Sequence, residues 1–161
     1  MSRLLIVYHS ATGGTEQMAR AAHVAATAEG HATLLHAADA GPDDLLSHDG
    51  YLFAAPENLA AIAGVMKDFF DRSYYPVLGR IEGRPYAQMV CAGSDGSNAA
   101  RQTARIATGW RLKQVQEPLI ICTKAQTPDQ ILAPKVIPVG DLDLCRDLGA
   151  ALAAGLTLGV F

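Results

Sequence analysis

The stretch Leu4–Ala19 constrains the fold of this chain more than any other, because it joins a strand pattern to a helix pattern through a loop of small residues. Its first part, Leu4–Tyr8, is apolar and rich in residues that favour β-strands. Its middle part, Ser10–Thr15, contains only glycine, alanine and hydroxyl side chains, and a helical pattern starts at Glu16. Unpaired N–H groups and the dipole at the start of such a helix attract anions. The stretch therefore predicts a strand, an anion-binding loop and a helix in succession.

The candidate anion loop has the pattern Ser-x-Thr-Gly-x-Thr. Ser10, Thr12 and Thr15 offer hydroxyl donors, and Gly13-Gly14 lets the backbone approach a ligand without a Cβ clash. The nucleoside-triphosphate loop needs a lysine, and the first lysine here is Lys67; the dinucleotide fingerprint needs three spaced glycines. We predict a phosphate loop that works without a cation, the alternative being an ordinary glycine-rich turn.

Composition points to one well-packed domain over residues 1–161. Half of the residues are hydrophobic and 18% are charged, and the net charge of −3 argues against nucleic acid or an anionic membrane as partner. Cys91, Cys122 and Cys145 are widely spaced and are interpreted as small buried residues of a protein in a reducing compartment. No signal-peptide or membrane-spanning pattern occurs, so we expect a cytoplasmic protein. The five histidines lack ligand spacing, and no metal site is predicted.

Apolar runs and helical patterns alternate along the rest of the chain. Further strands are predicted at Ala32–Leu35, at Tyr51–Ala55 with Pro56 as its end, at Tyr86–Ala92, and within Leu112–Cys122, which Pro118 must break or confine to an edge. Helices are predicted around Leu45-Leu46, from Ile62 to Arg72 with Ile62, Val65, Met66, Phe69 and Phe70 on the apolar face, over Ala99–Gly109, and from Asp141 as N-cap, burying Leu142, Cys145, Leu148 and Leu152. Lys124–Gly140 is punctuated by proline and matches no pattern.

This alternation predicts an α/β fold: a doubly wound, five-stranded parallel sheet of order 2-1-3-4-5 with helices on both faces. Ligands of such sheets bind at the carboxyl ends of the strands that flank the switch point, here the first and third. Three loops should meet there, namely Ser10–Thr15, Pro56–Ile62 and Gly93–Asn98.

The phosphate-loop pattern resembles that of the flavodoxin-like superfamily. The loop that starts Pro56-Glu57, followed by a helix ending Lys67-Asp68-Phe69-Phe70-Asp71-Arg72, resembles the NAD(P)H-dependent FMN enzymes of that superfamily. The resemblance implies non-covalent FMN, with its phosphate on the first loop, its N5 and O4 edge beside the backbone of Glu57–Ala60, and its pyrimidine edge at the third loop. The implied cofactor-binding residues are Ser10, Ala11, Thr12, Gly13, Gly14, Thr15, Pro56, Glu57, Asn58, Leu59, Ala60, Gly93, Ser94, Asp95, Gly96 and Asn98.

Other roles are open for several of these side chains. Glu57 is equally interpretable as a first-turn acid of the following helix, and Asn58 as a turn residue. Asp95 and Asn98 are equally interpretable as caps of the helix after the third loop.

The function implied by the resemblance is an FMN-dependent oxidoreductase that moves electrons from NADPH or NADH to a small acceptor such as a quinone or free flavin. The alternatives are a flavodoxin-type electron carrier and a flavin-free scaffold. The second and third loops contain Leu59 but no aromatic side chain, which favours an open flavin face and hence the enzyme. No catalytic acid or base is nominated, since the cofactor carries the chemistry. The roles open for Tyr74-Tyr75-Pro76 are the flavin mouth, a contact in a homo-oligomer, or local packing.

Overall fold

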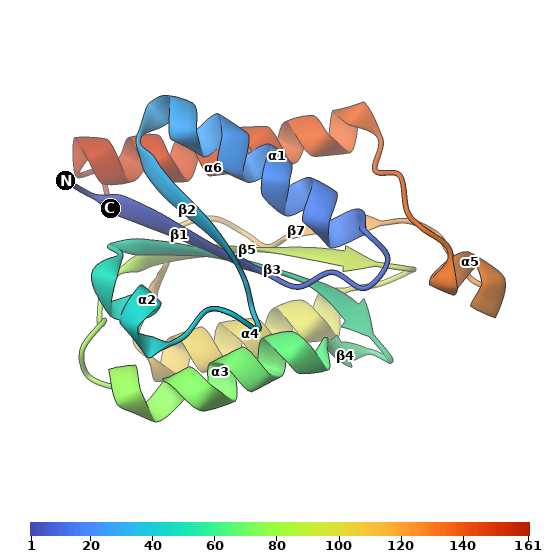
Figure 1. Ribbon diagram of the computed structural model, residues 1–161, viewed down its shortest axis with the longest axis horizontal. Coiled ribbons are helices and arrows are strands. Elements are labelled where there is room, and N and C mark those ends of the chain that lie inside the picture. Colours follow the sequence, from blue (N-terminus) through green and yellow to red (C-terminus); the bar gives the residue numbers. More distant parts are fainter.

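A computed structural model describes all residues from 1 to 161 as a parallel sheet between two layers of helices (Figure 1). One face of the sheet is covered by α1 (Gly14–Glu29) and α6 (Val139–Leu158). The other face is covered by α2 (Pro42–Ser47), α3 (Gly64–Val77) and α4 (Ser97–Gly109). No helix combines the length and the apolar character needed to cross a membrane.

The sheet confirms the predicted doubly wound order. Its parallel strands run β2-β1-β3-β5, and β6 and β7 both pair with β5 on the far side. Their bounds are β1 Arg3–Tyr8, β2 His31–His36, β3 Gly50–Asn58, β5 Pro85–Ala92, β6 Lys113–Gln114 and β7 Leu119–Cys122. The fifth position is thus shared by two short strands. The break contains Pro118, which has no N–H to donate to the sheet.

Pro56 does not end the third strand, which corrects the prediction. β3 continues to Asn58 and forms an antiparallel hairpin with β4 (Ala61–Ile62). Pairing with β1 has already stopped at Tyr8 opposite Ala54, so no neighbouring strand on that side requires an N–H from residue 56. Ile62 therefore lies in a strand and not in the helix.

Four helices begin at other residues than predicted. α1 begins at Gly14 and α4 at Ser97, each two residues before the predicted start at Glu16 or Ala99. α3 starts only at Gly64, and Val65 is exposed, whereas Met66, Phe69 and Phe70 are buried as predicted. α6 follows Pro138 and not Asp141, which lies inside the helix; Leu142 is only half-buried, while the other predicted core residues of this helix are buried.

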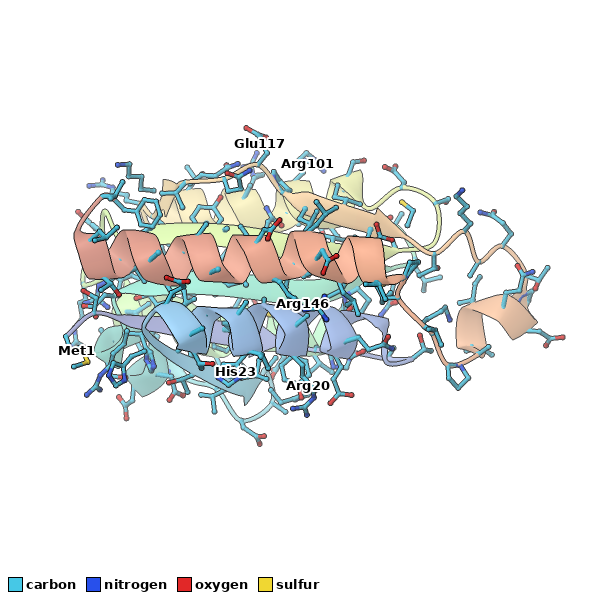
Figure 2. The ribbon with its side chains drawn as sticks, turned by 90° about the horizontal axis from the view of Figure 1, so that it is seen from above. Met1, Arg20, His23, Arg101, Glu117 and Arg146 are labelled. Atoms are coloured by element: carbon cyan, nitrogen blue, oxygen red, sulfur yellow. The ribbon has the colours of Figure 1, made fainter.

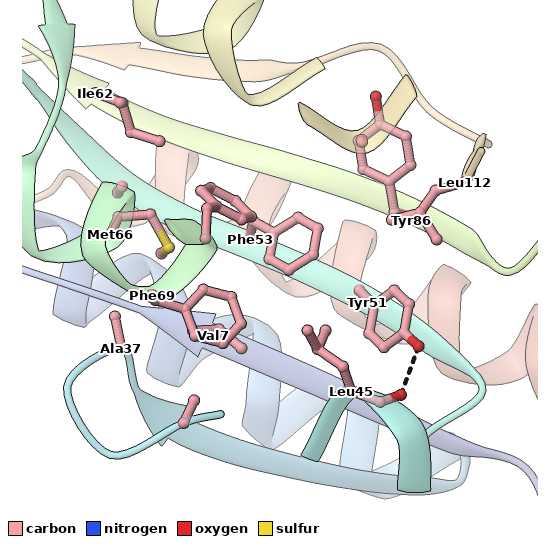
Figure 3. Close-up of a cluster of buried hydrophobic side chains, with 14 of the residues drawn as sticks. Val7, Ala37, Leu45, Tyr51, Phe53, Ile62, Met66, Phe69, Tyr86 and Leu112 are labelled. Atoms are coloured by element: carbon pink, nitrogen blue, oxygen red, sulfur yellow. Dashed lines mark hydrogen bonds between the residues drawn. The ribbon is translucent and has the colours of Figure 1, made fainter. Parts of the chain in front are cut away.

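Alternate residues of the central strands point to opposite faces, which divides the core in two. Figure 3 shows the cluster beneath α2, α3 and α4, where Phe53 lies against Phe69 and Phe70, with ring centroids 6.4 and 5.1 Å away. In the same cluster the Tyr51 hydroxyl donates to the carbonyl of Leu45 over 2.6 Å. On the opposite face α1 and α6 pack so closely that a Cβ at Gly149 would collide with the backbone of Ala22.

Tyr74 packs locally, as one of its three open roles predicted. Its ring stacks on that of Trp110 with centroids 5.6 Å apart, and its carbonyl accepts a hydrogen bond from the Trp110 indole. α3 runs back from β4 toward the amino edge of the sheet, so Tyr74 and the exposed Tyr75 lie at the end of α3 remote from the strand carboxyl ends (Figure 1). The flavin-mouth role is therefore wrong.

The segment that matched no pattern lies at the carboxyl edge of the sheet. It contains the short helix α5 (Pro128–Leu132), which stands out from the body of the molecule before the chain returns to α6 (Figures 1 and 2).

Candidate functional site

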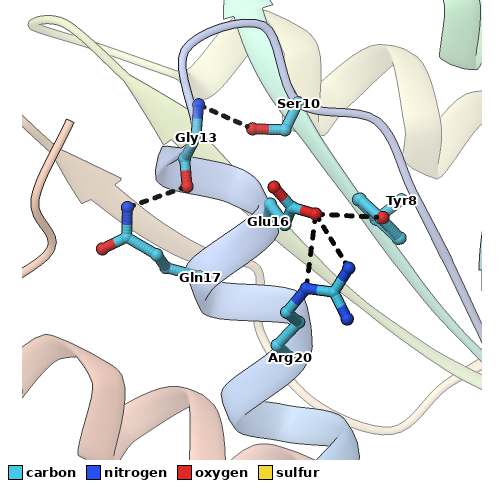
Figure 4. A network of polar contacts seen from close by, with 6 residues as sticks. All are labelled: Tyr8, Ser10, Gly13, Glu16, Gln17 and Arg20. Atoms are coloured by element: carbon cyan, nitrogen blue, oxygen red, sulfur yellow. Dashed lines mark hydrogen bonds and ion pairs between the residues drawn. The ribbon is translucent and has the colours of Figure 1, made fainter. Parts of the chain in front are cut away.

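The phosphate-loop candidate connects β1 to α1 at the carboxyl edge of the sheet. Gly13 occupies the N-cap position with a left-handed backbone (φ +93°), and its N–H donates to the Ser10 hydroxyl oxygen over 3.1 Å (Figure 4). No side chain caps α1, and the N–H groups of Ala11 and Thr12 donate to no protein acceptor. These donors and the helix dipole are therefore available to an anion.

Thr15 gives the loop its clearest sign of a missing partner. Its side-chain oxygen is buried and has no oxygen or nitrogen partner, its one polar neighbour being the Cys91 thiol, which is a weak acceptor, and the residue is only 1% exposed. Leaving a buried hydroxyl unpaired costs about 1–3 kcal/mol, so native proteins rarely do it without reason. Rotation of the Thr15 side chain about χ1 would turn this hydroxyl toward the N-terminus of α1, where a phosphate oxygen would supply the acceptor.

Gly14 is required by packing against the neighbouring strand. A Cβ at this position would lie 2.8 Å from Cys91 Sγ and 3.4 Å from Ile137 Cδ1. Burial raises the pKa of the Cys91 thiol, which the charge of Lys135 only partly offsets, so Cys91 stays a small neutral group. Burial also raises the pKa of Cys145, to about 12. Cys122 is exposed, contrary to prediction.

The first turn of α1 carries an ion pair beside the loop. Figure 4 shows the Glu16 carboxylate accepting from Arg20 Nη2 over 2.9 Å and from the Tyr8 hydroxyl over 3.4 Å. Because Arg20 balances its charge, Glu16 opposes an anion at the helix N-terminus less than a free carboxylate would.

A lysine that the sequence prediction missed lies beside the loop. The Lys135 backbone N–H donates to the Thr12 carbonyl over 2.9 Å, and its ammonium Nζ donates to the Thr12 hydroxyl oxygen over 3.3 Å. The loop itself contains no cation, as the sequence shows, but this lysine of a distant segment lies beside it. Only a lysine within the loop could have been recognised from sequence, and Lys135 comes 123 positions after Thr12.

The second loop is a tight turn between β3 and β4. Its two central residues, Leu59 and Ala60, both adopt the left-handed conformation, with φ of 51° and 59°. Asparagine and glycine are the usual residues of such a turn, and the left-handed region costs other residues roughly 1–2 kcal/mol each. Leu59 is fully exposed at the tip, and Asn58 flanks the turn opposite Ala61.

Glu57 joins the second loop to the third. Its carboxylate accepts from the backbone N–H of Gly96 over 2.9 Å and from that of Ala99 over 3.1 Å. It therefore caps α4, whose own N-cap residue is a glycine, at the favourable end of the helix dipole. The alternative role in the first turn of α3 is wrong, since α3 begins at Gly64.

Two further side chains of α4 hold the same turn. Asn98 Nδ2 donates to the Ala60 carbonyl over 2.5 Å, and Gln102 Oε1 accepts from the Ile62 N–H over 2.7 Å. The second and third loops thus form one unit, which the sequence could not show because its members lie about forty positions apart.

The third loop has fewer free donors than predicted, because Glu57 occupies the N–H of Gly96 and Asp95 that of Ser97. Asp95 Oδ1 accepts from the Ser97 N–H over 3.2 Å, and hydrogen bonding to the Ser97 hydroxyl and then to this N–H lowers the pKa of Asp95, which supports its capping role. Ser94 is exposed, and Gly93 packs so closely on the Ala125 carbonyl that a Cβ would lie 2.9 Å from it. All three predicted loops lie at the same edge of the sheet (Figure 1), and their contacts with FMN remain a prediction.

Residues 40–127, more than half of the chain and including the second and third loops, match the model of the family "NADPH-dependent FMN reductase". A flavodoxin of Aquifex aeolicus is 34% identical over 96 residues, which cover 58% of this chain and 50% of the relative. An NAD(P)H dehydrogenase (quinone) of Acidithiobacillus ferrooxidans is 36% identical over 95 residues, which cover 45% and 48% of the two chains. The chain thus spans about half the length of these two curated relatives.

Solved structures show the fold. A flavodoxin from the domain Archaea superposes with a TM-score of 0.77 at 17% identity, over 96% of this chain and 99% of that one. A WrbA-like flavodoxin of Agrobacterium tumefaciens superposes with a TM-score of 0.72 at 22% identity, over 98% and 99%. The flavodoxin-like fold predicted from the sequence is therefore confirmed. With the family match, this establishes that the chain belongs to the NADPH-dependent FMN reductase family, a family of oxidoreductases.

Proposed function

We propose that the protein is an FMN-dependent oxidoreductase that takes electrons from NADPH or NADH and passes them to a small acceptor such as a quinone or free flavin. Membership of the FMN reductase family supports the reaction class. One structural observation carries the cofactor assignment: the buried, unpartnered hydroxyl of Thr15 lies in the same loop as the free N–H groups of Ala11 and Thr12. Three donors of this kind suit a phosphate group.

The residues of the three loops would divide the work of holding FMN, which when bound supplies the electron-transfer chemistry. The first loop binds the phosphate and so fixes the position of the whole cofactor. The unit formed by Glu57, Gly96 and Asn98 orients the ring, because its hydrogen bonds make the second and third loops move together. No side chain of this chain is required as an acid or base.

The loops leave the ring site open, which supports an enzyme over an electron carrier. Neither Pro56–Ile62 nor Gly93–Asn98 contains an aromatic side chain that could cover the ring, and Leu59 is exposed to solvent. Tyr74 is held against Trp110 at the other end of α3 and is not available either. A nicotinamide can then stack on the flavin within about 3–3.5 Å of the reacting atoms.

A second candidate function is a flavodoxin-type electron carrier. It is favoured by one relative and several structural neighbours that are named flavodoxins. The net charge argues against the carrier, because a charge of only −3 provides little of the electric field that steers a protein partner. The negative sign of the charge also disfavours nucleic acid and anionic membranes as partners.

The deciding experiment starts with FMN fluorescence quenching to establish binding. The FMN-loaded protein is then mixed anaerobically with NADPH or NADH while the visible flavin absorbance is followed. The enzyme predicts rapid bleaching by one of the nucleotides and recovery of the absorbance on addition of a quinone. Bleaching by a chemical reductant but by neither nucleotide would favour the carrier, and absence of FMN binding would leave only the scaffold. Thr12→Glu, which places a carboxylate against the phosphate, is the matched non-binding control.

A further inference from the structure

The connection between α5 and α6 is fixed to the phosphate loop by its backbone. Gln17, in the first turns of α1, uses both atoms of its amide: Nε2 donates to the Lys135 carbonyl over 2.7 Å, and Oε1 accepts from the Ile137 N–H over 3.0 Å. The same Nε2 donates to the Gly13 carbonyl over 2.9 Å, and the Lys135 N–H donates to the Thr12 carbonyl. The backbone N–H and the backbone carbonyl of Lys135 are thus both hydrogen-bonded, which fixes this residue beside the loop.

The ammonium group of Lys135 is also held in position by hydrogen bonds. Nζ donates to the carbonyls of Ile131 and Ala133, over 2.8 and 2.6 Å, and to the Thr12 hydroxyl oxygen. No carboxylate lies within ion-pair distance of it, since the ion pairs of the protein all involve other residues. A half-buried positive charge without an anionic partner therefore stands beside a loop that has free donors for an anion.

The contact with Thr12 also sets the direction of a proton. A hydroxyl has one proton to donate and two lone pairs that accept. Because the Thr12 oxygen accepts from Lys135, its proton is directed to another acceptor, and the Lys135 charge lies one hydroxyl group away from whatever that acceptor is. This separation is shorter than the screening length of about 8–10 Å at physiological salt.

We propose that Lys135 is a positioning residue for the 5′-phosphate of FMN, which orients the Thr12 hydroxyl toward the phosphate and supplies the cation that the loop itself lacks. The consequence is selectivity for a phosphorylated flavin over riboflavin. This proposal rests on the proposed function only in taking FMN as the ligand of the loop. The competing explanation is that Lys135 merely closes the carboxyl end of α5 through its two carbonyl contacts.

The two explanations differ in which flavin they affect. Lys135→Met keeps most of the side-chain stem and removes the charge, and the dissociation constants of FMN and riboflavin are measured for it by fluorescence quenching. We expect FMN to bind roughly tenfold more weakly, because the phosphate loses the attraction of a positive charge one hydroxyl group away and Thr12 loses the bond that orients its proton, and riboflavin to bind as in the wild type. Lys135→Arg should retain most of the FMN affinity. The salt dependence of FMN binding should be weaker in Lys135→Met than in the wild type.

The matched control is Lys113→Met, which removes an exposed lysine of β6, beside the amino end of β5, whose side chain makes no hydrogen bond or ion pair, and which should leave both affinities unchanged. Thermal melts of the ligand-free variants, with Lys135→Gln as a second neutral variant, check that the fold persists. Equal weakening of FMN and riboflavin, or unchanged FMN affinity in both neutral variants, would overturn the proposal while leaving the proposed function intact. A wild-type protein that binds neither flavin would overturn both.

Discussion

The carboxylate of Glu57, at the end of β3, accepts a hydrogen bond from the backbone N–H of Gly96, 2.9 Å away on the loop after β5. A second bond, from the Ala99 N–H, completes the cap of α4. A side chain of the second loop therefore caps the helix that begins at the third, so the geometry of the proposed flavin-ring site and the stability of α4 depend on the same residue.

Replacing Glu57 should destabilise the protein measurably. Glu57→Ala leaves two partly buried N–H groups without an acceptor, and we expect the free energy of unfolding to fall by about 2 kcal/mol. Glu57→Gln keeps one acceptor oxygen and should lose less. Chemical denaturation measures both. Glu82→Ala, which removes only an exposed ion pair with Arg111, should change stability by less than about 1 kcal/mol; an effect as large as that of Glu57→Ala would contradict the assignment.

Thr15→Val should have opposite effects on stability and on binding. The substitution keeps the shape of the side chain and removes a buried hydroxyl whose one polar neighbour is the weakly accepting Cys91 thiol, so the ligand-free protein should be as stable as the wild type or slightly more stable. FMN should bind roughly tenfold or more weakly, because a hydrogen bond to the phosphate is lost. The melting temperature of the ligand-free protein measures the stability, and a fluorescence titration measures the affinity for FMN. A loss of stability in the absence of ligand would show that the hydroxyl has a structural partner.

Gly14→Ala should destabilise the protein although alanine favours helices. The new Cβ would lie 2.8 Å from Cys91 Sγ, and overpacking of this kind costs about 1–3 kcal/mol. The double variant with Cys91→Ala removes the obstructing sulfur and should be less destabilised than the sum of the two single variants. Gly140→Ala serves as the control, since nothing lies near its added Cβ, and it should be neutral or stabilising. If the free-energy changes of Gly14→Ala and Cys91→Ala simply added up in the double variant, the overpacking would not be due to the Cys91 sulfur.

The turn at Leu59 and Ala60 should be improvable by the residues that its conformation favours. Ala60→Gly relieves a left-handed alanine and should raise the free energy of unfolding by roughly 0.5–1 kcal/mol, and Leu59→Asn should add to it. Ala151→Gly, the same exchange at an exposed position in the middle of α6, should lower stability by about 1 kcal/mol. Thermal melts of the two variants measure whether Ala60→Gly raises stability and Ala151→Gly lowers it. A destabilising Ala60→Gly would mean that the turn is not left-handed in solution.

Acidification should weaken the protein through His9, whose ring meets that of His36. Their rings meet with His9 Nδ1 3.3 Å from His36 Nε2, while His36 Nδ1 accepts from the Ala38 N–H, so His36 Nε2–H donates to His9. Burial and then the charge of His36 lower the pKa of His9. The unfolded chain therefore binds more protons below the ordinary histidine pKa of about 6.5, and stability is lost as pH falls from that value toward the lowered pKa.

The check is the melting temperature above and below that pH in the wild type and in His9→Gln. The variant should lose less stability on acidification. His31→Gln, at an exposed position where the side chain makes no hydrogen bond, should retain the full pH dependence. A His9→Gln variant with unchanged pH dependence would assign the effect to another group.

The sequence by itself determined the order of strands and helices, because that order follows from local properties. Apolar β-rich runs such as Leu4–Tyr8 form strands wherever they are buried, and the short connections with right-handed crossovers leave few topologies. Ser10–Thr15 could be recognised for the same reason, since all of its donors lie within one turn of backbone. The end of β3 could not be predicted in this way. Proline has no N–H, so Pro56 interrupts the strand only if a neighbouring strand needs a donor at that position.

Only the tertiary structure decided which distant groups complete the site. Lys135 reaches Thr12 because the chain after α5 returns to α6 across the N-terminus of α1, and Glu57 reaches Gly96 because β3 and β5 are neighbours in the sheet. Neither pairing leaves a mark in its local sequence: a lysine between prolines and a glutamate after one have no preferred partner until packing supplies it. The local pattern thus specifies a strand, a small loop with free donors and a helix, and the path of the folded chain specifies the charge that lies beside that loop.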